Sequence, residues 1–514
     1  MNNFFTDFSK NLDKIQNYKI LYSVLPIVFI IFLWFLDEGL AVGLLFLSIL
    51  AIATFLVLLK IGIKDKKIYT IFLIVFFTHL CAVLFIYFTG FRPFGGGADY
   101  ELYNNTAIQI ADRFSHFNFS LERLYSAHYF PVLIGVIYIY TLPQMIIGQL
   151  FTVWLAGISA IILYLLVLEI GGTKKSAFLA GLIVAFYPSY LYFGSLLLKD
   201  TLVIPIALSG LLLSVKILKN FSVLKFSAFF IFLTALIHFR FYIGYALLFS
   251  FVISWFLASG FAIKKRTIYG IVMIFILGFS PQMLGSGYYG FKNLEAFLTP
   301  QKITFYREII YNTSSVNQVL CPELSVPAST DPPVSAPSSD MPLCPIFENH
   351  SPFIKTDAMA TKTNSQRGEG SSFVVDVGFK EGILTFFKNY LESFIYSFAG
   401  PFPWQIVHTR QLFALIENIP WYLLLIVFIY NFIKLVKREG ILKILVRHKL
   451  VAPLFFFGLI SLGALSLFIN NFGIILRIRM PVFISFFCII VLFFNLEKIY
   501  EKIFSYWRSR VYRF

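Results

Sequence analysis

Apolar segments long enough to cross a membrane, about 20 residues each, recur along the whole chain and alternate with short polar segments. This pattern is typical of an all-α polytopic membrane protein and predicts about twelve transmembrane helices. The predicted spans are residues 20–36, 40–59, 68–88, 146–170, 177–189 and 195–216, two segments that end at His238 and before Lys264, residues 268–284, 421–433 and 451–468, and a last segment that ends near Asn495.

Basic residues follow every second predicted span. Lysines follow the second span within residues 60–67, the fourth at 174–175 and the sixth at 216–219, and further Lys and Arg residues follow the eighth, tenth and twelfth. Cytoplasmic loops carry an excess of Lys and Arg. We therefore expect both chain termini in the cytoplasm, and the loop after the third span on the outer face of the membrane.

The composition agrees with this class. Of the 514 residues, 58% are hydrophobic and only 13% are charged, whereas soluble domains carry about a quarter charged residues. The net charge of +16 lies mainly in the short loops between spans, so it indicates membrane topology and contact with membrane lipids, and we expect no nucleic acid as partner.

The first long polar segment, residues 91–103, follows the third span. Its three consecutive glycines let other groups approach the backbone closely, and Asp99 follows them. An ionisable residue beside a membrane span indicates a functional site, although Asp is also the residue type that caps helices in ordinary surface loops. Beyond it, residues 104–117 are amphipathic and 129–142 are apolar but short, which predicts interfacial or re-entrant helices.

A second polar region, about residues 285–417, is far longer than an ordinary connection. Its centre is rich in Pro and Ser, which is typical of irregular chain, and residues 373–397 predict one or two helices along the interface. Cys321 and Cys344 flank the Pro- and Ser-rich part, and an oxidising compartment favours a disulfide between them over two free thiols. These segments divide the chain into residues 1–90, 91–145, 146–284, 285–417 and 418–514.

Charged residues gather on the predicted outer face, where spans end: Asp99, Glu101, His128, Lys199, Asp200, Arg240, Arg477 and Arg479. A charge at the end of an apolar helix is unfavourable without a partner or a polar ligand. Taken alone, Lys199 and Asp200 favour an interfacial ion pair. One guanidinium group can donate two parallel hydrogen bonds to the oxygens of a phosphate. Arg477 and Arg479 therefore predict either a phosphate site or contact with anionic lipid headgroups.

Short motifs occur in order along the chain: Gly97-Ala98-Asp99-x-x-x-Tyr103-x-x-x-Ala107, His128-Tyr129-Phe130-Pro131, Phe186-Tyr187-Pro188, Ser195-Leu196-Leu197-Leu198-Lys199-Asp200, Trp421, Asn471-x-Gly473 and Arg477-x-Arg479-x-Pro481. In this combination the chain resembles the GT-C superfamily of membrane glycosyltransferases that use polyprenyl-phosphate-linked sugars. The resemblance is to the bacterial group related to protein mannosyltransferases, lipid A aminoarabinose transferases and glycosyltransferase family 39. The chain differs from many members in having two spans before the span that leads into the Asp99 loop, and it lacks the Trp-Trp-Asp signature of oligosaccharyltransferases.

The resemblance implies a multi-pass enzyme of the bacterial inner membrane whose site faces the periplasm or exterior. It implies that Asp99 activates an acceptor glycan, lipid or protein, and that the donor phosphate is held by cations, namely Lys199, Arg240, Arg477 and Arg479. Further site candidates are Glu101, Tyr103, His128 and Asp200. A single displacement would invert the anomeric carbon, and a divalent metal bound by Asp99 or Asp200 stays open. The alternatives are an O-antigen or exopolysaccharide polymerase or ligase, and a lipid or oligosaccharide transporter.

Overall fold

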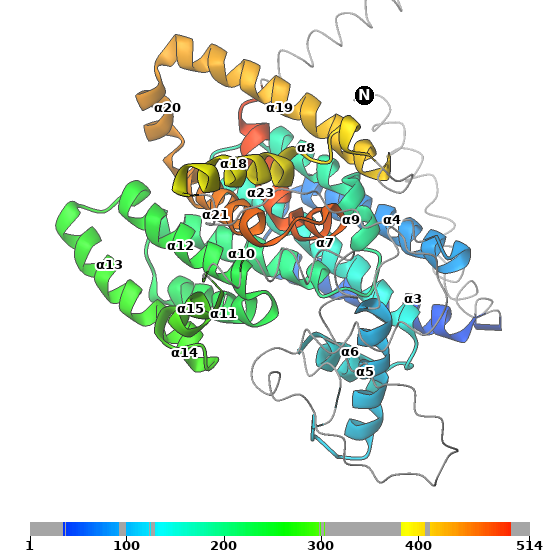
Figure 1. Cartoon of the computed structure of the whole chain (residues 1–514). Helices are drawn as coiled ribbons and strands as arrows, with labels where there is room; N and C mark the ends of the chain where they lie inside the picture. Colours follow the sequence, from blue (N-terminus) through cyan, green and yellow to red (C-terminus); the bar gives the residue numbers. More distant parts are fainter. Residues whose placement is uncertain are drawn as a thin grey trace, which may run out of the picture.

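The structure is a computed structural model that describes residues 37–91, 99–122, 129–297, 382–406 and 412–494, with the single positions 34, 35, 124, 299 and 303. Throughout these residues the regular structure is helical, without a β-strand. The fold class expected from the sequence, an all-α polytopic membrane protein, is therefore confirmed (Figure 1).

Within the described residues, eight helical segments are long and apolar enough to cross a membrane. They comprise α3 (Glu38–Lys60), α4 (Lys66–Thr89), α7 (Met145–Glu169), α10 (Asp200–Lys219), α12 (Phe241–Ala258), α13 (Ile263–Leu277) with α14 (Phe279–Met283), α19 (Leu412–Glu439) and α21 (Ala452–Phe468). The shorter elements are α5 (Asp99–Ser115), α6 (Tyr129–Ile139), α8 (Lys174–Ala185), α9 (Pro188–Phe193), α11 (Val223–Phe239), η2 (Tyr288–Gly290), α15 (Phe291–Phe297), α18 (Ile383–Ala399), η4 (Pro403–Gln405), α20 (Ile441–Arg447), η6 (Lys449–Val451), α22 (Phe472–Ile478) and α23 (Met480–Leu492).

Every predicted span within the described residues contains a helix, but three of these helices are short. α8 has 12 residues, or about 18 Å at the helical rise of about 1.5 Å per residue, and it ends just before Pro188 starts α9. α11 has 17 residues, and α23 has 13 and meets α22 at 56°. The first predicted span, 20–36, lies almost wholly outside the described residues. The structure thus supports eight spans, or nine with the bent pair, and twelve stays a prediction.

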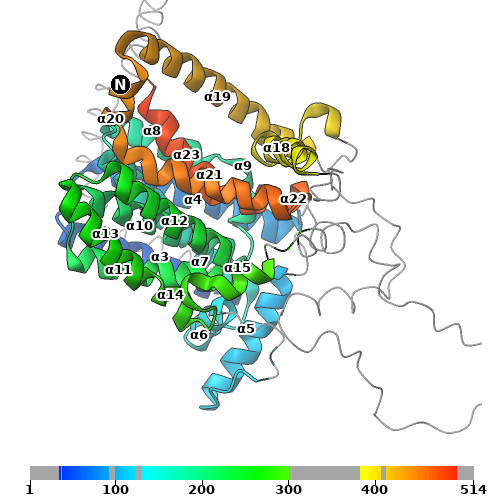
Figure 2. The ribbon, with the colours of Figure 1, turned by 60° about the vertical axis from the view of Figure 1, so that its left-hand side comes forward.

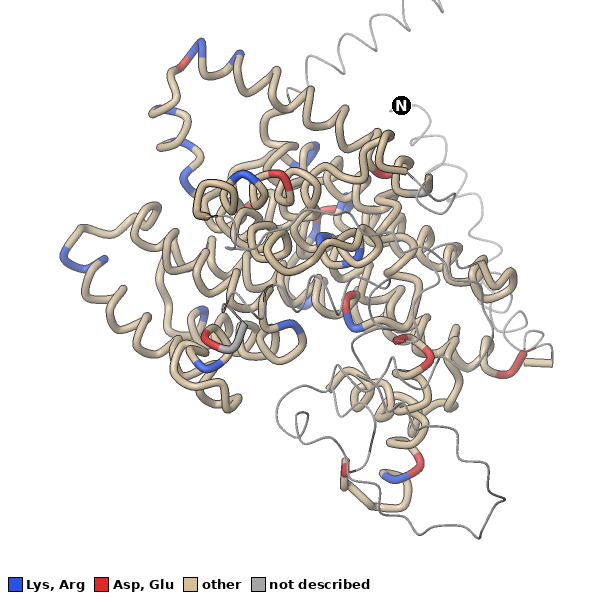
Figure 3. The backbone as a smooth tube through the Cα atoms, in the orientation of Figure 1, with Lys and Arg blue, Asp and Glu red and all other residues tan. Residues whose placement is uncertain are grey.

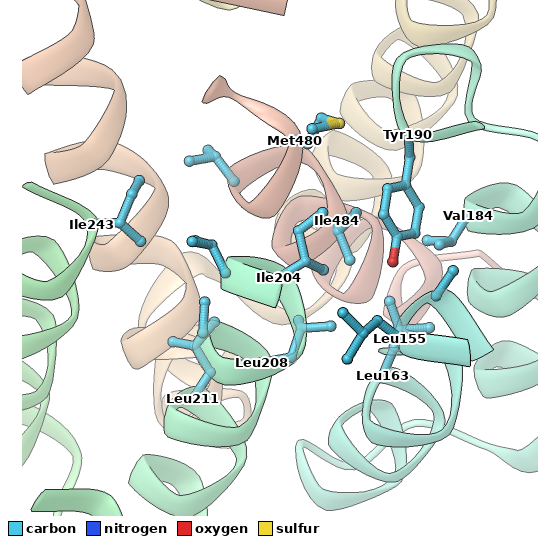
Figure 4. Packing of buried hydrophobic residues seen from close by; sticks show 14 of the residues in the cluster. Leu155, Leu163, Val184, Tyr190, Ile204, Leu208, Leu211, Ile243, Met480 and Ile484 are labelled. Carbon is cyan, nitrogen blue, oxygen red and sulfur yellow. The ribbon is translucent and has the colours of Figure 1, made fainter. Parts of the chain in front are cut away.

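The core forms around α7, the most buried of the candidate spans: 78% of its apolar window is buried inside the protein, against 6% for α19. Figure 4 shows side chains of α7, α8, α10, α12 and α23 meeting there, among them Leu155, Val184, Leu208, Ile243 and Ile484. α19 instead exposes most of its apolar surface and crosses beside the bundle (Figure 2). α19 therefore depends on a few contacts for its position.

Charge distinguishes the two ends of the bundle. At one end, here called the basic end, Lys and Arg cluster at the α12–α13 turn and along α20 (Figure 3). Ion pairs join neighbouring turns there: Lys174 Nζ lies 3.1 Å from Asp65 Oδ2, and Lys219 Nζ lies 2.8 Å from Glu169 Oε1. This separation follows the charge pattern on which the predicted topology rests. The compartment that the basic end faces stays a prediction.

α5 and α6 extend from the opposite end of the bundle (Figures 1 and 2). α5 buries one face, including Tyr103 and Ile110, and Gly135 lets α6 approach it, since a Cβ there would lie 2.8 Å from Ile110 Cγ2. The buried Tyr138 hydroxyl of α6 also donates to Asn104 Oδ1 at 2.8 Å. These contacts hold α5, whose first residue is Asp99, against α6.

Candidate functional site

Asp99, Lys199, Asp200, Arg240 and Arg477 form one group of charged side chains, here called the charged cluster, at the end opposite to the basic end. Arg477 donates from Nη1 to Asp99 Oδ2 at 2.6 Å and from Nε to Asp200 Oδ2. Arg240 donates from Nε to Asp200 Oδ1 at 2.9 Å, and its Nη2 lies 2.6 Å from the same oxygen. Asp200 is therefore shared by two arginines, and Arg477 links it to Asp99.

Helix ends bring these residues together. Asp99 and Asp200 lie in the first turns of α5 and α10, where the helix dipole favours negative charge. Arg240 lies between α11 and α12, and Arg477 in the last turn of α22, where the dipole favours positive charge. The cluster thus joins four segments that are far apart in the sequence.

Burial makes these charges depend on one another. The side chains of Asp200, Arg240 and Arg477 are 6%, 11% and 15% exposed, whereas that of Asp99 is 44% exposed. A charge that loses its partner inside a protein leaves the remaining charge uncompensated. Asp200 is therefore placed to hold the two arginines, and Asp99 is the more accessible carboxylate.

Burial also changes the proton affinity of Lys199 and of the neighbouring Tyr103, both of which lie outside the candidate spans. The pKa of Lys199 is lowered to about 7, first because its side chain is buried and then because Arg240 is close. The pKa of Tyr103 is raised to about 12 by burial and then by the charge of Asp99, so its hydroxyl stays protonated at neutral pH. The site thus combines an ammonium that titrates near neutrality with a phenol.

The cluster retains capacity for an anion. Arg477 Nη2 is buried without a hydrogen-bond partner among the residues that the structure describes. A buried donor without an acceptor is unfavourable. Charge-assisted hydrogen bonds from guanidinium suit phosphate oxygens, so an anionic group beside Arg477 would satisfy this donor.

Arg479 lies apart from the cluster. Arg477 and Arg479 are two residues apart at the end of a helix, and at 3.6 residues per turn this places them on nearly opposite faces. The Arg479 side chain is fully buried, and its Nη2 donates to Glu417 Oε1 at 2.7 Å and to Asn418 Oδ1 at 2.9 Å. The structure therefore does not bring Arg479 together with the other predicted phosphate-binding cations.

The other predicted site residues are placed as follows. Tyr103 is buried beside the cluster, and the exposed Glu101 accepts from the Tyr100 hydroxyl at 2.9 Å. His128 and the cysteines of the predicted disulfide, Cys321 and Cys344, lie outside the described residues. In the part of the chain that the structure describes, no three metal-ligating side chains gather, so it gives no ligand set for the divalent metal that the sequence left open.

Sequence reasoning missed Glu417 and Asn418. Both are buried in the first turns of α19, where Glu417 accepts from the backbone N–H and the hydroxyl of Ser189, and from the Tyr187 hydroxyl. The sequence carries a signal for them, because a Glu between Leu415-Ile416 and Ile419-Pro420 is a charge within an apolar run. The division placed between residues 417 and 418 falls within α19, which begins at Leu412.

Comparisons of the chain with known protein families, with curated proteins and with solved structures give no match.

Proposed function

We propose that the protein is an inverting membrane glycosyltransferase of the GT-C type, which transfers a sugar from a polyprenyl-phosphate-linked donor to an acceptor at the charged cluster. The observation that carries this proposal is Arg477, which binds both carboxylates of the cluster and keeps Nη2 without a partner among the described residues. The sequence resemblance supports the same assignment, since Asp99, Lys199 and Arg477 all stand in its motifs.

The reaction follows from the roles that these groups can take. An acceptor hydroxyl attacks the anomeric carbon, the bond from that carbon to the phosphate oxygen breaks, and the phosphate leaves with the bonding electrons. Asp99 takes the acceptor proton, because it is the more exposed of the two carboxylates. Arg477 and Arg240 stabilise the charge that develops on the leaving phosphate. Attack opposite to the leaving group inverts the anomeric configuration.

The position of the cluster suits a lipid-linked donor. Asp200 and Arg240 lie at the ends of the candidate spans α10 and α12, so a phosphate bound there has its polyprenyl chain beside apolar helices. A donor of this kind enters from the bilayer and reaches the cluster without leaving the bilayer. The sugar then lies toward α5, on the side of Asp99.

The test of this proposal is the binding of a polyprenyl monophosphate, the leaving group common to all such donors. We expect Arg477→Ala to weaken binding about tenfold or more, since a hydrogen bond to a charged group contributes about 1.5–3 kcal/mol. Binding is measured on the purified full chain in detergent. Arg447→Ala at the basic end, where Arg447 pairs with Glu439, is the matched control. Equal affinity of the wild type and the Arg477→Ala variant would remove the phosphate site from the cluster.

Lys199 gives the binding a pH dependence. Its pKa of about 7 means that the ammonium is present below pH 7 and is lost as the pH rises through this value. Affinity for an anion should therefore fall between pH 6 and pH 8.5, by at most about tenfold per pH unit. The suitable probe is the methyl ester of a polyprenyl phosphate, because a diester keeps one negative charge throughout. Lys199→Gln should flatten the profile, and an unchanged slope in this variant would contradict the assignment.

A further inference from the structure

We infer that the buried pair Arg479–Glu417 positions the charged cluster, and that both are positioning residues for a polyprenyl-phosphate donor. This inference rests on the proposed function for its ligand, and on the contacts below for its geometry. The geometric basis of this inference is that one ion pair joins the two chain segments that carry Arg477 and Asp200.

The first segment is the junction of α22 and α23. Arg479 is the residue at which the two helices meet at 56°. Pro481 has no N–H group and cannot donate to the carbonyl of Arg477 four residues earlier, which accounts for the break. Arg479 fixes this corner, because Nη1 donates to Gly400 O at 2.9 Å and Nη2 binds Glu417. Arg477 stands two residues before Arg479, so its direction depends on how Arg479 is held.

The second segment is α9 and its continuation into α10. Glu417 accepts from the backbone N–H of Ser189 at 3.1 Å, and from the Tyr187 hydroxyl at 3.2 Å. These bonds hold the first turn of α9, and six residues after the end of α9 the chain reaches Lys199 and then Asp200. Glu417 thus contacts both Arg479 and the segment that leads to Asp200.

The Arg479–Glu417 pair should be sensitive to the substitution of either residue, because both charges are buried. The side chains of Arg479 and Glu417 are 0% and 2% exposed, so each depends on the other for compensation of its charge. Aromatic rings lie beside Arg479: its guanidinium lies 4.5 Å from the Phe483 ring centre, and Trp421 stacks on the same ring at 4.3 Å. Loss of one partner would therefore disturb α9, α19 and the α22–α23 corner together.

The geometric part is tested without any ligand, by the thermal unfolding of Glu417→Gln, Asp200→Asn and the double variant. Sites that act independently give additive shifts of the midpoint. We expect Asp200→Asn to shift the midpoint in the Glu417→Gln background by at most about half of its shift in the wild type, because the cluster is already displaced. Additive shifts would overturn the inference, whatever the protein binds.

The functional part is tested by the affinity of the purified full chain for a polyprenyl monophosphate. We expect Glu417→Gln to weaken binding about tenfold, a change of about 1.4 kcal/mol, and the double variant Glu417→Gln with Arg479→Gln to regain most of the affinity, because a neutral pair leaves no buried charge uncompensated. Asp65→Asn, which removes a carboxylate from the network with Tyr164 and Lys174 at the basic end, is the matched control and should bind normally.

The outcomes separate the inference from the function on which it rests. If the double variant binds more weakly than Glu417→Gln alone, Arg479 contacts the phosphate itself and the positioning role is wrong. The positioning role is also wrong if Glu417→Gln binds as tightly as the wild type. If the wild type does not bind a polyprenyl monophosphate, the proposed function fails, and the unfolding shifts alone decide on the geometry.

Discussion

Asp99→Asn should reduce sugar transfer by a factor of about a hundred or more while the protein still folds and binds the donor. Asn keeps the size and hydrogen-bonding capacity of Asp but cannot accept the acceptor proton, and general-base catalysis typically contributes about 10²–10⁴-fold. Folding should survive because the Asp99 side chain is 44% exposed and Asp200 still compensates Arg477. The measurement is the turnover of purified protein with a polyprenyl-phosphate-linked sugar, at saturating donor.

The control for this variant is Asp112→Asn. Asp112 lies on the same helix, is exposed and contacts His116, so its substitution changes the charge of α5 without touching the cluster. Turnover should then stay near that of the wild type. Full activity of Asp99→Asn together with loss of activity in a folded Asp200→Asn would move the role of base to Asp200. Unaffected turnover in both would favour a transporter over a transferase.

Asp200→Asn should act mainly on stability. Asp200 is 6% exposed and accepts from both Arg240 and Arg477, so the substitution leaves the buried Arg240 without its carboxylate and leaves Arg477 with Asp99 alone. Removal of one partner of a buried ion pair costs about 3–5 kcal/mol. We expect a large fall in the thermal midpoint, measured by the loss of the monodisperse peak in size-exclusion chromatography after heating.

Asp65→Asn provides the comparison for Asp200→Asn. Asp65 pairs with Lys174, whose side chain is 63% exposed, at the basic end. Water screens such a pair, and exposed pairs contribute about 0.2–1 kcal/mol, so the fall in midpoint should be much smaller. Equal falls for the two variants would show that the cluster is no more strongly coupled than a surface pair.

The helices of this fold are largely readable from the sequence. A helix is the structure that satisfies the backbone of an apolar segment in a membrane, and α3, α4 and α7 begin and end within about two residues of their predicted bounds. The part of the chain that the structure describes contains fewer helices of spanning length than predicted spans, because some apolar segments continue where the helix does not. The clearest case is Pro188, which separates α8 from α9 and leaves each too short to cross alone.

The residues of the site were predictable from the sequence, but which of their side chains pair with one another was not. Asp99, Lys199, Asp200, Arg240 and Arg477 stand out as charges at span ends, and the structure brings them together. Arg479 has the same chemical signature as Arg477. Only the helical conformation of α22, capped by Asn471, sends the two side chains in opposite directions. Glu417 was missed because it stands just before the span predicted at 421–433 and was not treated as a charge within an apolar run.

The wide sequence separation within the charged cluster determines when, during synthesis, the contacts of the cluster can form. Asp200 finds Arg240 after 40 further residues, but Arg477 follows 277 residues after Asp200 and 378 after Asp99. At a synthesis rate of about 5–20 residues per second, the ribosome needs about 15–55 s to deliver Arg477 after Asp200. Until then Asp99 lacks the arginine that pairs with it, so the nascent chain inserts its spans with an unfinished site that only the last helices close.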